Sequence, residues 1–145
     1  MAAREGLPLT IVSDGFGLHV RPMLATAGLA HLPVITNTWD RGSLVFGAAH
    51  PTCIGCGTCK KQAVEQARET HGPVAFVGDG VSDRFGALYA DVTFAKDDLA
   101  EHCRRGSIPF FPFHDFEDVQ RGLAQLDTPT GAVGGEPCPG WRVPA

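Results

Sequence analysis

The chain has 145 residues, of which 43% are hydrophobic, so it is long enough to bury the core of one globular domain. Its net charge of −4 and its scattered lysines and arginines argue against nucleic acid as the main partner, because neutralising phosphates requires clustered basic residues. No apolar run approaches the roughly 20 residues that span a bilayer, and the first residues lack the apolar core of a signal peptide. We therefore expect a cytoplasmic protein with no membrane partner.

Apolar runs alternate with helical patterns along the chain, which is the signature of βαβ units and a parallel sheet. Strands are predicted over residues 9–13, 33–36, 74–77 and 92–94, with a short one near 110–112. Helices are predicted over residues 21–30, 60–70, 83–89, 97–104 and 116–126. A small hairpin is expected at residues 38–46, turning at Asp40-Arg41-Gly42. The predicted fold class is therefore α/β.

This pattern predicts one core domain over residues 1–126. Residues 127–145 are rich in Pro, Gly and Thr and have no periodicity. Such a segment cannot bury enough apolar surface to order itself, so we expect a disordered tail.

The most informative motif is Gly78-Asp79-Gly80-Val81-Ser82-Asp83, which follows the apolar run Val74–Val77. Such a run suits a strand buried on both faces of a parallel sheet, and these sheets bind ligands beyond the carboxyl ends of their strands. Asp79 lies at that end, and Asp83 falls on the first turn of the next helix. Two carboxylates that converge there form a site for Mg²⁺, which prefers oxygen ligands. Helix capping by both aspartates is the alternative.

Three segments, in this order, resemble later motifs of the haloacid dehalogenase (HAD) superfamily of phosphatases. Residues 9–16 resemble the second motif, a strand that ends in Ser or Thr; Lys60 stands where the third motif has its lysine; and Gly78–Asp83 resembles the fourth motif. Residues 90–99 and 108–116 resemble the closing strands of one branch. That branch contains phosphoserine phosphatase-like enzymes and methionine-salvage phosphatases acting on phosphorylated keto-thiopentenes. The resemblance implies a Rossmann-like (HAD-like) parallel sheet with flanking helices.

The resemblance also implies Mg²⁺-dependent hydrolysis of a small phosphorylated metabolite through an aspartyl-phosphate. Asp79 would bind Mg²⁺, with Asp83 as a second ligand or as support for the first. Lys60 would neutralise phosphate charge and act as a catalytic residue. We prefer it to the adjacent Lys61 because it directly follows a cysteine, as in the family.

The same resemblance assigns substrate binding to Ser13, Asp14 and Gly15. The Ser13 hydroxyl would be catalytic, donating a hydrogen bond to the transferring phosphoryl group, and the backbone N–H groups of Asp14 and Gly15 would assist it. Asn37 follows the second predicted strand and either faces the substrate or forms a turn.

The family's first motif, Asp-x-Asp-x-Thr/Ser, has no counterpart in these 145 residues. In the family it supplies the nucleophilic aspartate, and the small cap that follows it selects the substrate. We therefore expect the C-terminal part of a phosphatase, inactive by itself, which leaves open whether this chain is an enzyme. A non-catalytic remnant that binds a phosphorylated ligand or a partner protein is the alternative.

The absent segment also includes the central first strand of the family's sheet. Without it, two apolar strands would expose unpaired edges that invite association with another chain. We therefore expect a homo-oligomer, or a partner chain that supplies the missing strand.

A cysteine-rich loop precedes the third-motif lysine, with Cys53, Cys56 and Cys59 at Cys-x-x-Cys-x-x-Cys spacing and His50 three residues ahead. These four side chains would suffice for a tetrahedral Zn²⁺, so a zinc-binding module is a further alternative. A local iron–sulfur cluster would need a fourth cysteine at the position of Ala63. The remaining alternative is a loop of reduced thiols. The chain has five cysteines, and an odd number cannot all pair in disulfides within one chain.

Overall fold

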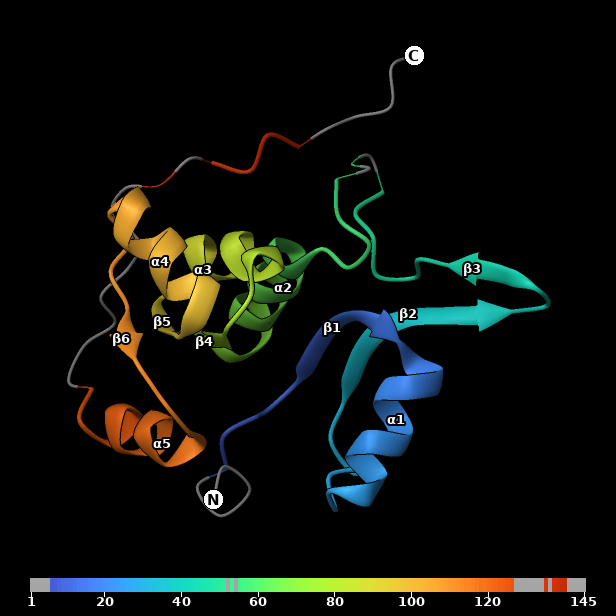
Figure 1. Ribbon diagram of the computed structural model, residues 1–145, viewed down its shortest axis with the longest axis horizontal. Coiled ribbons are helices and arrows are strands. Elements are labelled where there is room, and N and C mark those ends of the chain that lie inside the picture. The colour runs from blue at the N-terminus through green and yellow to red at the C-terminus, as the bar shows by residue number, and fades with distance from the viewer. Residues whose placement is uncertain (1–5, 52, 54, 127–134, 136, 141–145) are drawn as a thin grey trace. The chain divides into compact units, whose positions relative to one another are not determined.

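The computed structural model describes residues 6–51, 53, 55–126, 135 and 137–140 (Figure 1). The chain divides into two compact units. Unit 1 comprises Met1–Cys59 with Gly140–Ala145, and unit 2 comprises Lys60–Pro139. Most of the tail predicted for residues 127–145 lies outside the described residues.

Unit 1 contains a three-stranded sheet and one helix. Its elements are β1 (Ile11–Phe16), α1 (Gly17–Thr26), β2 (Val34–Asp40) and β3 (Ser43–Val45). The strand order is β1-β2-β3, with β1 parallel to β2 and β2 antiparallel to β3. The β1–β2 register is irregular between Val12 and Phe16, so β1 departs from a regular strand near its carboxyl end.

The predicted hairpin is confirmed. Arg41 and Gly42 connect β2 to β3 with φ values of 47° and 83°. Two consecutive residues with positive φ are the requirement of a type I′ turn, whose twist matches that of the flanking strands. Helix α1, by contrast, begins and ends earlier than predicted. Gly28 has a φ of 73°, which terminates the helix before residue 30.

Unit 2 is a parallel α/β unit. Its elements are α2 (Lys60–His71), β4 (Ala75–Gly78), the 3₁₀ turn η1 (Val81–Asp83), α3 (Arg84–Tyr89), β5 (Val92–Ala95), α4 (Asp97–Gly106), β6 (Phe111–Pro112) and α5 (Phe116–Ala124). The strand order is β4-β5-β6, and both pairings are parallel. Parallel strands with flanking helices agree with the predicted α/β, Rossmann-like class.

Strand β5 is the core of unit 2, because all four of its residues are buried. Ala95 packs with Leu99 and Cys103 of α4, while Val92 and Phe94 pack with Val119 of α5. Alternating side chains of a strand point to opposite faces, so helices cover both faces of β5.

The prediction that residues 74–77 form a strand buried on both faces is wrong. Ala75 is exposed, and the rest of β4 is only partly buried. β4 lies at the end of the strand order, where a strand has a neighbour on one side only. No helix among the described residues has both the length and the apolar character that a membrane crossing requires.

Candidate functional site

The predicted fourth motif forms a tight turn after β4. Asp79 follows the strand directly, and η1 brings the Asp83 carboxylate back against it. A Cβ atom on Gly78 would lie 2.7 Å from Asp83 Oδ2, so only glycine leaves room for that carboxylate. Gly78 therefore permits the close return of Asp83 to the strand end.

Asp83 is buried and fully engaged. Its Oδ2 atom accepts hydrogen bonds from the backbone N–H groups of Asp79 and Gly80, each at 3.1 Å. Its Oδ1 atom lies 2.5 Å from Lys60 Nζ. A carboxylate used in this way positions the Asp79 backbone, so the geometry favours the supporting role for Asp83 over that of a direct metal ligand.

Among the described residues of unit 2, Lys60 is the buried cation. Lys60 is 7% exposed, and its Nζ atom donates hydrogen bonds to Ser82 Oγ, at 2.9 Å, and to Asp83 Oδ1. Lysine is almost never buried unless it is paired. Lys61 instead lies nearer the surface, 3.6 Å from Glu65 and over the Tyr89 ring. The two lysines thus differ in burial and in pairing, and the catalytic role of Lys60 stays a prediction.

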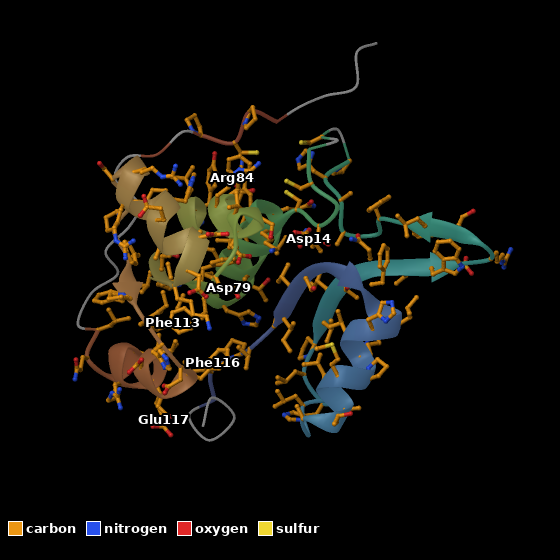
Figure 2. The ribbon with its side chains drawn as sticks, viewed as in Figure 1. Asp14, Asp79, Arg84, Phe113, Phe116 and Glu117 are labelled. Atoms are coloured by element: carbon orange, nitrogen blue, oxygen red, sulfur yellow. The ribbon has the colours of Figure 1, made fainter. Side chains whose placement is uncertain are left out.

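Asp79, labelled in Figure 2, is exposed, and its carboxylate has no hydrogen bond or ion pair within the described part of the chain. A free carboxylate at the carboxyl end of a parallel strand fits Mg²⁺, which takes one or two carboxylates and retains several waters. Among the described residues, no three His, Cys, Asp or Glu side chains are close enough to hold a metal ion. A cation at Asp79 would therefore take its other ligands from water, substrate or further residues.

The predicted phosphate-binding residues of unit 1 form a second cluster. The Gly15 backbone N–H donates to Ser13 Oγ at 3.1 Å. Asn37 Nδ2 donates to the Asp14 carbonyl at 2.8 Å, and Asn37 is 2% exposed. Its side-chain amide therefore binds the backbone of β1. Asp14 Oδ1 accepts the backbone N–H of Thr58 at 3.0 Å.

Sequence reasoning missed two members of this cluster. Thr58 Oγ1 donates to the Ser13 carbonyl at 3.0 Å, and the Thr36 hydroxyl donates to the Gly15 carbonyl. Both threonines are buried. Neither belongs to a motif, and only the three-dimensional pairing of β1 with β2 and with the end of the cysteine loop reveals them.

The zinc site predicted at His50, Cys53, Cys56 and Cys59 is not supported. All four residues are described, yet they do not form a cluster that could hold a metal ion. Among the described residues the three cysteines form no disulfide, and Cys53 Sγ accepts the Gly55 N–H at 3.4 Å.

Sequence comparison supports the predicted resemblance. A protein of Brevibacillus brevis is 31% identical over 129 residues, which is 84% of this chain and 58% of that protein. A protein of Bacillus velezensis is 29% identical over 130 residues, covering 84% of this chain and 54% of that protein. A protein of Bacillus cytotoxicus is 35% identical over 71 residues. All three are named 2-hydroxy-3-keto-5-methylthiopentenyl-1-phosphate phosphatase.

The chain is similar to bacterial phosphatases. This similarity agrees with the resemblance to methionine-salvage phosphatases of the HAD type. The chain spans little more than half the length of the first two relatives. No family model matches the sequence.

Proposed function

We propose that this chain is the C-terminal part of a Mg²⁺-dependent, HAD-like phosphatase that acts on a small phosphorylated metabolite. The buried Lys60–Asp83 ion pair beside the free carboxylate of Asp79 carries this proposal. An ion pair that excludes water is costly to form, and it is retained where a charge must be held in place. Here it holds a cation and orients the turn that presents a metal-binding carboxylate.

Each residue has a defined task in this proposal. Asp79 holds Mg²⁺, and the bound ion supplies charge stabilisation to the phosphoryl group. Lys60 adds a fixed positive charge, because Ser82 and Asp83 restrain its ammonium group. Ser13 and the N–H groups of Asp14 and Gly15 bind the phosphoryl oxygens.

The nucleophile comes from outside these residues. A phosphatase of this type attacks phosphorus with an aspartate of an Asp-x-Asp-x-Thr/Ser segment, and the 145 residues contain no such segment. We place that aspartate, together with the central first strand, in a longer form of the protein. The greater length of the relatives supports this assignment.

The first test is the intact mass and activity of the protein purified from its native source. We expect a mass several kilodaltons above 15.4 kDa and hydrolysis of an aryl phosphate only when Mg²⁺ is present. In this form, Asp79→Asn should lower turnover by at least about 100-fold because the metal loses its carboxylate. Asp98→Asn, an exposed change in the first turn of α4, is the matched control and should retain turnover.

Two results would contradict the proposal. One is undiminished turnover in the Asp79→Asn protein. The other is a native mass of 15.4 kDa with no hydrolysis of the aryl phosphate. In the second case, binding of orthophosphate without turnover would favour a non-catalytic phosphate-binding remnant. That candidate rests on the presence of phosphate-binding groups in a chain without a nucleophile.

A further inference from the structure

Three consecutive carbonyl groups at the end of β1 each accept a hydrogen bond from a side chain. Thr58 Oγ1 donates to the Ser13 carbonyl at 3.0 Å, and Asn37 Nδ2 donates to the Asp14 carbonyl at 2.8 Å. The Thr36 hydroxyl donates to the Gly15 carbonyl. Most backbone carbonyl groups accept hydrogen bonds from backbone N–H groups. Three successive carbonyls that accept from buried side chains are therefore unusual.

Two of these donors, Thr58 and Asn37, form one cluster. Thr58 Oγ1 lies 3.5 Å from Asn37 Oδ1, so the carbonyls of Ser13 and Asp14 turn toward neighbouring donors. In a regular strand, successive peptide groups alternate in direction. The irregular register between Val12 and Phe16 is what allows two successive carbonyls to reach the same cluster.

The planar trans peptide determines where the amides point. In each peptide group the N–H of the following residue is directed opposite to the carbonyl. Fixing the carbonyls of Ser13 and Asp14 on the cluster therefore turns the N–H groups of Asp14 and Gly15 away from it. Gly15 N–H also donates to Ser13 Oγ at 3.1 Å, which brings the hydroxyl to the amide side. Successive amides that point the same way form an anion-binding nest.

The acidic side chain of the turn is held back by the same residue. Thr58 N–H donates to Asp14 Oδ1 at 3.0 Å, which places the carboxylate on the side of the cluster. A carboxylate beside the amides would repel an anion, so this bond removes a like charge from their face.

We propose that Thr58, Asn37 and Thr36 are positioning residues that shape the Ser13–Gly15 turn into a nest for a tetrahedral oxyanion, the phosphate of a phosphomonoester. This inference rests on the proposed function and extends it: the end of the cysteine-rich loop serves the phosphate-binding turn. Burial makes the cluster rigid, since Asn37 is 2% and Thr58 1% exposed. Gly57 permits the close approach, because a Cβ there would lie 3.1 Å from Asn37 Nδ2.

The test compares variants of the 145-residue chain in two measurements by NMR: hydrogen exchange of the Asp14 and Gly15 amides without ligand, and orthophosphate affinity. Thr58→Val removes the hydroxyl and keeps the shape of the side chain. We expect about tenfold faster exchange of these amides and about tenfold weaker orthophosphate binding, the effect of one hydrogen bond. Thr58→Ser, which retains the hydroxyl, should restore both to within about twofold.

The matched control is Thr26→Val in α1 of the same unit, where an exposed hydroxyl donates to the Pro22 carbonyl at 3.0 Å. It should change neither measurement. If Thr58→Val fails to fold, Thr36→Val tests the same idea on the next carbonyl. Unchanged exchange in a folded Thr58→Val or Thr36→Val chain would overturn the inference. If Thr58→Val speeds exchange but the wild-type chain binds no orthophosphate, the positioning role stands and the assignment of phosphate binding to the Ser13–Gly15 turn is contradicted.

Discussion

At the residue scale, the Lys60–Asp83 pair is the interaction whose loss should cost most. Neither residue is more than 8% exposed, so removing one charge leaves the other buried without its partner. We expect Asp83→Asn to lower the free energy of unfolding by about 3 kcal/mol, measured by urea titration. Glu65→Gln is the matched control, because Glu65 pairs with Lys61 at the surface and should cost less than about 1 kcal/mol. Equal costs for the two variants would contradict this view of the buried pair.

Asp118 gives a pH prediction at the same scale. The backbone N–H groups of His114 and Asp115 donate to its carboxylate and hold its pKa below the ordinary value. The folded state therefore binds fewer protons here than the unfolded state. The stabilisation is complete above about pH 4 and is lost as the pH falls through the lowered pKa of the folded state.

The measurement is the thermal midpoint of unfolding between about pH 2 and pH 5, for the wild-type chain and for Asp118→Asn. We expect the wild-type midpoint to fall more steeply with acid, because the variant has no carboxylate to protonate. Parallel curves for the two proteins would show that Asp118 does not contribute to acid sensitivity.

At the element scale, the packing of α5 on β5 depends on one glycine. A Cβ on Gly122 would lie 2.5 Å from the Phe94 ring, and Phe94 is fully buried. We expect Gly122→Ala to destabilise unit 2 by about 1–3 kcal/mol through overpacking, although alanine favours a helix. Gly106→Ala in α4 is the control, because its Cβ would make ordinary contacts at 3.5 Å and more. Stabilisation by both changes in urea unfolding would contradict the close approach.

The elements and residues predicted from sequence share one property, which is that their signals are local. The hairpin turn, the Gly78–Asp83 motif and the parallel α/β order are encoded within a few residues of where they form. One error is local, the position of α1, which ends before Gly28. The others concern relations across the chain. Burial of β4 depends on its place in the strand order, and Thr58 lies 44 residues from the aspartate that it holds. A short stretch of sequence does not include both partners of such a contact.

At the scale of the whole molecule, the two units differ in what they bury. Among the described residues, Cys59 is the only buried hydrophobic residue of unit 1, and the two hydrophobic clusters both belong to unit 2. Unit 1 buries polar side chains instead, and it exposes apolar ones such as Leu18, Met23 and Trp39. Burial of apolar surface is the main stabilising term in folding, so unit 1 has little of its own.

We propose that a further segment of the same protein, the one that carries the nucleophile and the first strand, covers unit 1. Within the described residues, β1 and β4 each lie at the end of a strand order and have one free edge. Edges of this kind pair with an added strand. An added strand along β1, with the chain that follows it, would bury apolar side chains that unit 1 now exposes.

Hydrogen exchange of the 145-residue chain tests this proposal. We expect amides of β1 and β2 to exchange at least about 100-fold faster than amides of β5, because local stability follows buried apolar contacts. In the longer form that we propose, the β1 and β2 amides should become protected, whereas those of β5 should change little. The alternative is that a second copy of the chain covers unit 1. Sedimentation over a range of concentrations would then show association, and the protection of the β1 and β2 amides would grow with it. Equal protection of both units in a monomeric 145-residue chain would mean that unit 1 needs no cover.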